Sequence, residues 1–86
     1  LRSFVIGEQS IVNHQKTYNL IGEKLKELRI KAGFTSYKDF AMEYNLSWRH
    51  YWEVGKGKNI NMKTLVNLLT IHGTTLYDFF RDKRFK

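Results

Sequence analysis

Three lysines stand close together in the sequence around one helix-capping residue. Lys56, Lys58 and Lys63 surround Asn61, and Asn is a preferred N-cap of an α-helix. The backbone N–H groups of a helix N-terminus attract anions, as lysine ammonium groups do, and phosphate is a common ligand of both. The spacing therefore indicates a phosphate-binding surface, and the alternative is a solvated loop without a ligand.

No group of residues in the sequence predicts catalysis. His14, His50 and His72 stand apart in the sequence, with no carboxylate or second ligand at metal-binding spacing. No nucleophile–base pairing, Gly-rich phosphate loop or pair of carboxylates is present. We therefore expect no enzyme activity, no metal and no cofactor, and no small-molecule ligand is evident.

Charge and composition narrow the class of partner. The 86 residues include 15 Lys and Arg against 8 Asp and Glu, a net charge of +7. This excess favours an anionic partner, nucleic acid first and a membrane surface second. No apolar run approaches the roughly 18 residues of a membrane span. The absence of cysteine excludes a disulfide-stapled miniprotein and a thiolate zinc finger.

Apolar spacing and capping residues predict one all-α domain of five helices. Ile21, Leu25, Leu28 and Ala32 share one face of the first helix, which Gly33 ends. Asn45 is expected in a left-handed turn, and Gly73 ends the fourth helix. The N-caps expected for the second to fifth helices are Ser36, Ser47, Asn61 and Thr75.

The two ends of the chain are expected to lie outside this domain, which spans residues 19–81. Residues 1–18 form an N-terminal arm or extension. Within it, residues 2–6 fit a short strand or an apolar arm that packs on a partner, and residues 14–18 fit a backward extension of the first helix. Residues 82–86 form a basic tail that contacts nucleic acid non-specifically or is a frayed, soluble end.

The second and third helices have the spacing of a helix-turn-helix. Ala41 is small where the following helix must cross close by, and Asn45 is permissive at the turn. Leu46, Tyr51 and Val54 are apolar where the third helix must be seated. The alternative is a small helical bundle with no nucleic-acid function.

The flanking residues extend this pattern. They are the segments IGEKLKELR (21–29), GFT (33–35), GKN (57–59), TLVNLL (64–69) and GTTLYDFF (73–80). Over roughly residues 20–80 the chain resembles the Cro and phage-repressor class of helix-turn-helix domains, the XRE or lambda-repressor-like family. It departs from the usual pattern in one extra residue between Gly33 and Phe40, in Gly55, and in the bulky Trp48 and Trp52.

The resemblance implies a compact five-helix domain that binds duplex DNA as a transcriptional regulator, with the third helix in the major groove. It also implies a cytoplasmic, nucleoid-associated regulator of bacterial or phage type, usually a homodimer. The positions expected to contact bases are Trp48, Arg49, His50, Trp52 and Glu53. Those expected to contact phosphates are Ser36, Tyr37, Ser47, Lys56, Lys58, Asn59 and Lys63.

Several of these side chains have a second interpretation. The Arg49 guanidinium can fork onto guanine, and Glu53 can accept from cytosine or pair with Arg49 one turn earlier. Trp48 and Trp52 can contact thymine methyl groups, bind a protein partner, or place one ring against the N-terminal arm as extra core. The alternative function is therefore a protein-interaction module that uses this Trp48/Trp52 face and the apolar N-terminal arm.

A homodimer, if formed, would use the C-terminal aromatic region or the N-terminal arm. Phe79, Phe80 and Phe85 lie near the C-terminus. They are expected in the core, and the alternative is that they form the dimer interface, as the resemblance implies.

Overall fold

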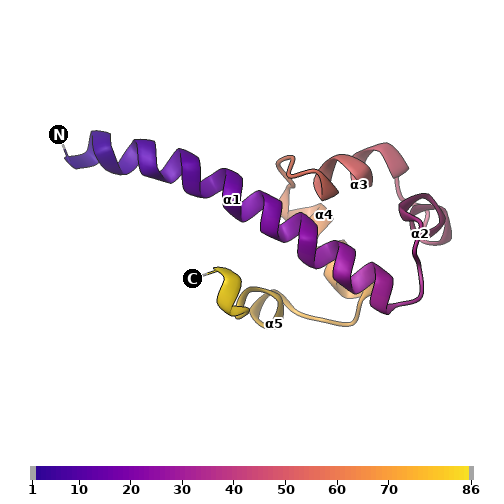
Figure 1. Ribbon diagram of the computed structural model, residues 1–86. Coiled ribbons are helices and arrows are strands. Elements are labelled where there is room, and N and C mark those ends of the chain that lie inside the picture. Colours follow the sequence, from indigo (N-terminus) through magenta and orange to yellow (C-terminus); the bar gives the residue numbers. More distant parts are fainter. Residues whose placement is uncertain (1, 86) are drawn as a thin grey trace.

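The computed structural model describes the backbone of residues 2–85 and the side chains of residues 14–85. This part of the chain forms five α-helices and one short 3₁₀ helix, without a strand (Figure 1). The helices are α1 (Arg2–Lys31), α2 (Tyr37–Glu43), α3 (Trp48–Gly55), α4 (Met62–Ile71), α5 (Leu76–Phe80) and the 3₁₀ helix η1 (Lys83–Phe85). The predicted all-α class with five α-helices is confirmed.

Helix α1 is far longer than the sequence pattern indicated. Its 30 residues correspond to about 45 Å at 1.5 Å per residue, and its N-terminal half reaches out beyond the other helices (Figure 1). The predicted helical extension over residues 14–18 is confirmed, and the strand over residues 2–6 is wrong because the helix continues through them. From residue 2 onward the expected arm is thus part of α1. The predicted contact of this arm with a partner involves side chains that lie outside the described residues.

The predicted helix caps form as expected. Each N-cap side chain accepts a hydrogen bond from a backbone N–H in the first turn of its helix, which satisfies a donor with no partner inside the helix. The bonds are Asp39 N to Ser36 Oγ (3.2 Å), His50 N to Ser47 Oγ (3.3 Å), Thr64 N to Asn61 Oδ1 (2.8 Å) and Asp78 N to Thr75 Oγ1 (3.1 Å). Gly33 and Asn45 have φ angles of 98° and 56°, so these turns also follow the prediction.

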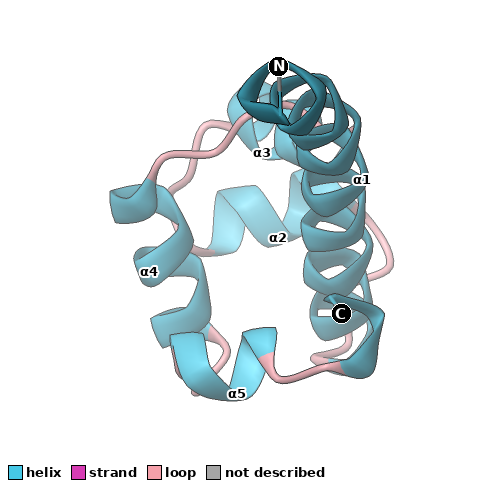
Figure 2. Ribbon diagram, turned by 90° about the vertical axis from the view of Figure 1, so that its left-hand side faces the viewer, coloured by secondary structure: helices cyan, strands magenta, loops and turns pink. Residues whose placement is uncertain are grey.

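An aromatic cluster around Phe40 forms the centre of the core. Phe40 is fully buried. Its ring centroid lies 5.4 Å from that of Phe34, 5.1 Å from that of Tyr51 and 5.1 Å from that of His72, with the His72 ring stacked at 5°. Aliphatic side chains complete this core: Ile21, Leu25, Val54, Leu65, Leu68 and Leu69. Figure 2 shows α1 along one side of this core, with α2, α3, α4 and α5 arranged around the rest of it.

The C-terminal segment is held against α1. Arg84 donates to both carboxylate oxygens of Glu27, at 2.8 and 2.9 Å, and also binds Asp82. Lys24 donates to the carbonyl of Phe79 at 2.8 Å. The hydrogen bonds from Arg84 hold the pKa of Glu27 below its usual range. The described part of the expected basic tail is therefore a packed element of the fold.

The three C-terminal phenylalanines belong to this packing. Phe79 is buried, and Phe80 and Phe85 are half-buried. Their ring centroids lie 4.9 to 5.9 Å apart, so much of their apolar surface is covered within the chain. The expected core role of Phe79 is confirmed.

Candidate nucleic-acid interface

A tight turn joins α2 to α3. The N–H of Leu46 donates to the carbonyl of Ala41 at 2.7 Å, and Asn45 between them takes the left-handed conformation. Ala41 is fully buried. These contacts fix the two helices against each other and place α3 where its far side is free of the bundle.

Helix α3 is also set against α1, at a glycine. A Cβ added to Gly22 would lie 2.7 Å from the carbonyl oxygen of Val54 and 2.9 Å from that of Gly55. Only glycine permits so close an approach of two backbones. Just beyond α3, the Gln15 side chain donates to the carbonyl of Gly57 at 3.2 Å. Helix α1 therefore determines where the C-terminal end of α3 lies.

The outer face of α3 presents Arg49 beside two tryptophans. Tyr51 and Val54 are buried on the inner face, and successive residues turn by 100° around a helix, which places Arg49 on the opposite side. Trp48 and Trp52 remain 43% and 42% exposed. The expectation that one of these rings joins the core is therefore wrong, because the inner face of α3 is already filled by Tyr51 and Val54.

Cations lie over both indole rings. The ammonium of Lys38 is 4.7 Å from the Trp48 centroid, and the Arg49 guanidinium is 5.9 Å from it. The ammonium of Lys56 is 5.6 Å from the Trp52 centroid. Cation–π contacts at such distances are worth about 0.5–1 kcal/mol when exposed. The tryptophans thus help to hold three positive charges over α3.

One of the expected base-contacting residues, His50, lies away from this face. His50 is half-buried and lines a hollow shared with Asn67 of α4. Glu53 follows Arg49 by one helical turn and so lies on the same side of α3, where it is half-buried. The alternative of an Arg49–Glu53 salt bridge is not formed among the described side chains, and Arg49 is exposed.

The expected phosphate-contacting residues divide into two groups. Lys56, Lys58, Asn59 and Lys63 are exposed. The hydroxyls of Ser36 and Ser47 already accept cap hydrogen bonds. Tyr37 is half-buried, with its ring centroid 6.3 Å from that of Trp48. Ser47 is exposed as well and keeps its O–H as a donor, so the less accessible members are Ser36 and Tyr37.

Ion pairs are distributed unevenly over the part of the fold whose side chains are described. Within the described side chains, all ion pairs link α1, α5 and the C-terminal segment: Lys24–Asp82, Arg81–Asp78, Arg84–Glu27 and Arg84–Asp82. The cations on and beside α3 take part in none of these pairs: Lys38, Arg49, Lys56, Lys58 and Lys63. Sequence reasoning missed Lys38, which only its contact with Trp48 identifies.

The histidines and acids with described side chains do not gather into a metal-binding group. The described residues contain no group of three or more His, Asp or Glu side chains that could hold a metal. His72 stacks on Phe40, its Nε2 is buried without a hydrogen-bond partner, and burial lowers its pKa. No described helix combines the length and apolar character needed to cross a membrane.

Comparison of the chain with protein-family models, with curated proteins and with solved structures gives no match in any of the three.

Proposed function

We propose that this protein binds duplex DNA sequence-specifically as a transcriptional regulator, with α3 in the major groove. The observation that carries the proposal is the set of cations on and beside α3 that form no ion pair among the described side chains, while each ion-paired carboxylate lies on α1, on α5 or in the C-terminal segment. Cations gathered on one side bind the phosphate backbone and release its counterions. The major groove, about 12 Å wide, admits an α-helix.

The turn between α2 and α3 supports the same function. A helix-turn-helix presents its second helix to base edges while the first crosses the backbone. Arg49 is exposed on α3 and is the expected base-contacting residue, and Lys58 and Lys63 are expected to bind phosphate. The resemblance to the Cro and phage-repressor class is independent support, since it rests on segments outside the turn.

Fluorescence anisotropy of labelled duplex DNA tests the proposal. We expect affinity for random duplexes to fall steeply with salt. If Lys56, Lys58 and Lys63 each neutralise one phosphate, the log–log slope is about −3 for a monomer and about −5 for a homodimer. A selected operator should bind more tightly than random DNA. Absence of binding at low salt would overturn the proposal.

Two variants separate base contact from phosphate contact. Arg49→Ala should cost about 1–3 kcal/mol on the operator and little on random DNA. Lys58→Ala should weaken both DNAs alike and reduce the salt slope by about one. Arg81→Ala is the matched control, because it removes the same charge at the C-cap of α5, away from α3. Equal losses for Arg49→Ala and Arg81→Ala would exclude a role of α3 in sequence recognition.

The exposed tryptophans favour one alternative, a protein-interaction module. Trp48 and Trp52 are both more than 40% exposed, and tryptophan is a frequent anchor of protein interfaces. A complex made by these rings would be far less sensitive to salt than a DNA complex. Binding to a protein partner that Trp48→Ala abolishes, together with no DNA affinity, would establish this function instead.

A further inference from the structure

A pocket lies between α1 and α3, beside the face assigned to DNA. It has a volume of about 250 Å³. Its lining residues on α1 share one helical face and are Gly22, Leu25, Lys26 and Arg29. Those on α3 and its C-cap are Tyr51, Trp52, Val54, Gly55 and Lys56. Tyr37 of α2 closes one end. The close approach at Gly22 thus brings two helices together around a hollow.

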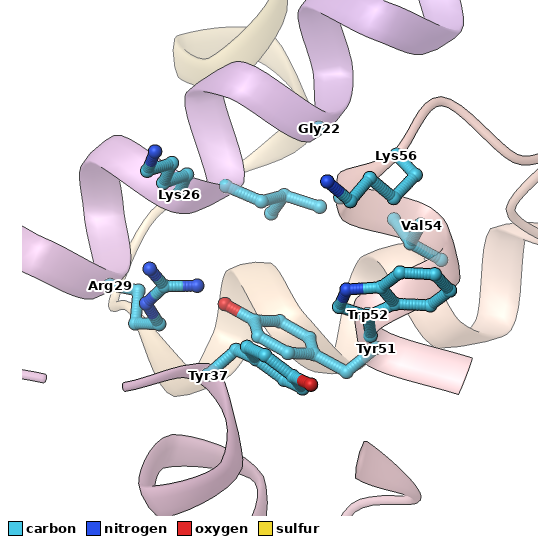
Figure 3. Close-up of a pocket in the computed structure, with 10 residues that line it drawn as sticks. Gly22, Lys26, Arg29, Tyr37, Tyr51, Trp52, Val54 and Lys56 are labelled. Carbon is cyan, nitrogen blue, oxygen red and sulfur yellow. The ribbon is translucent and has the colours of Figure 1, made fainter. Parts of the chain in front are cut away.

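The charged lining of this pocket is entirely positive. Lys26, Arg29 and Lys56 line it, and no carboxylate does. Figure 3 shows the Arg29 guanidinium and the Lys56 ammonium reaching toward the central space from α1 and from the end of α3. Arg29 is buried and uses its Nε and Nη2 atoms to donate to the carbonyls of Phe34 and Thr35, at 3.1 and 3.3 Å. Its third nitrogen, Nη1, takes part in neither of these backbone hydrogen bonds.

A tyrosine hydroxyl beside Arg29 has no acceptor for its proton among the described residues. Tyr51 is only 6% exposed, and its Oη is buried without a hydrogen bond. Figure 3 shows this hydroxyl beside the Arg29 guanidinium. Burial raises the pKa of Tyr51, with Arg29 opposing in part, so the group is a protonated donor at neutral pH. A buried donor left unsatisfied is destabilising, and a ligand oxygen that accepts its hydrogen bond would remove this penalty.

The other walls are apolar and aromatic. The rings of Tyr37 and Trp52 and the aliphatic side chains of Leu25 and Val54 complete the lining. A cavity of about 150 Å³ is known to hold one benzene molecule. The volume here therefore suits one aromatic ring with a small substituent, and is below the range for drug-sized ligands.

We propose that this pocket binds a small aromatic carboxylate. The carboxylate accepts hydrogen bonds from the Tyr51 hydroxyl and from Nη1 of Arg29, and Lys56 supplies a second positive charge. The ring lies against Trp52 and Tyr37. A planar carboxylate matches the donor geometry of a guanidinium better than a point charge does. The proposal does not depend on DNA binding, and its test contains no DNA.

Titration of the full chain with sodium benzoate, followed by NMR, tests the site. The two tryptophans give one indole N–H resonance each, and only Trp52 lines the pocket. We expect a saturable shift of the Trp52 indole N–H while that of Trp48 stays in place. Benzamide lacks the charge and inorganic phosphate lacks the ring, so each should bind much more weakly.

Matched variants locate the contacts. Tyr51→Phe removes only the unpartnered hydroxyl, so the chain should fold as before and bind benzoate roughly tenfold more weakly. Tyr77→Phe removes a hydroxyl from an exposed tyrosine outside the pocket and should leave binding unchanged. Lys56→Ala should weaken binding, whereas Lys63→Ala, with the same loss of charge, should not.

Three results would overturn the proposal. They are the absence of a saturable Trp52 shift in the unmodified chain, equal binding of benzoate and benzamide, and equal losses for the pocket variants and their controls.

Discussion

The contact between α1 and α3 predicts an unusual response to alanine. Gly22 lies inside a helix, where alanine is ordinarily favoured over glycine by about 1 kcal/mol. Here the added Cβ would lie 2.7 Å from the Val54 oxygen and 2.9 Å from the Gly55 oxygen. Both are backbone atoms, which cannot rotate away as a side chain can. Overpacking of this kind costs about 1–3 kcal/mol, so we expect Gly22→Ala to lower the free energy of unfolding by up to about 2 kcal/mol.

Urea denaturation and thermal unfolding measure this effect. In a domain of this size each kcal/mol changes the Tm by about 4–8 °C. Gly55→Ala is the control, since nothing lies within 4 Å of its added Cβ and its φ is not positive. We expect it to be neutral or to stabilise by up to about 1 kcal/mol. A Gly22→Ala protein more stable than the unmodified chain would refute the close approach of α1 and α3.

Three further predictions concern stability. Burial lowers the pKa of His72, so as the pH falls the unfolded chain binds a proton at this residue before the folded chain does. The free energy of unfolding should therefore fall as the pH drops below about 6.5. Urea titrations of His72→Phe should show a smaller loss of stability in that range. Arg29→Ala should cost about 2–4 kcal/mol, because it leaves two carbonyl acceptors without a charged donor; a loss below 1 kcal/mol in urea would contradict this. Asn61→Ala should cost about 1 kcal/mol through the lost cap of α4, whereas Asn59→Ala, which removes no cap, should leave the Tm unchanged.

The features predicted well from the sequence are those fixed by a few neighbouring residues. An N-cap such as Ser36 bonds the N–H three residues on, so both partners are visible in a short window. The left-handed Asn45 follows from its own side-chain chemistry. The buried face of Tyr51 and Val54 follows from helical spacing. These signals are independent of the rest of the fold.

The features that sequence reasoning missed depend on distant partners. Nothing in the sequence near Arg29 indicates that it is buried, and it is buried because the carbonyls of the α1–α2 loop accept its hydrogen bonds. The Lys24–Asp82 pair joins residues far apart in the chain. Residues 2–6 contain β-branched and aromatic residues typical of a strand, but they continue α1 because no proline or cap interrupts the helix.

The face of α3 illustrates the same limit. The sequence could not predict whether Trp48 and Trp52 are both exposed. Their exposure depends on whether another helix covers the side of α3 on which they lie. The pocket was not predicted either, since its lining comes from three helices. A signal was nevertheless present in the sequence. Gly22, Lys26 and Arg29 recur at helical spacing and so share one side of α1.

The pocket and the surface proposed for DNA share Lys56 and Trp52. If both proposals hold, a carboxylate bound beside Lys56 neutralises a charge that DNA phosphate would otherwise use. Thermodynamic linkage then requires the two ligands to weaken each other by the same factor, whichever binds first. The loss of one phosphate contact reduces the salt slope by about one, so the ligand's effect on DNA affinity should shrink as salt rises. Such a dependence would distinguish competition for Lys56 from a displacement of α3 against α1.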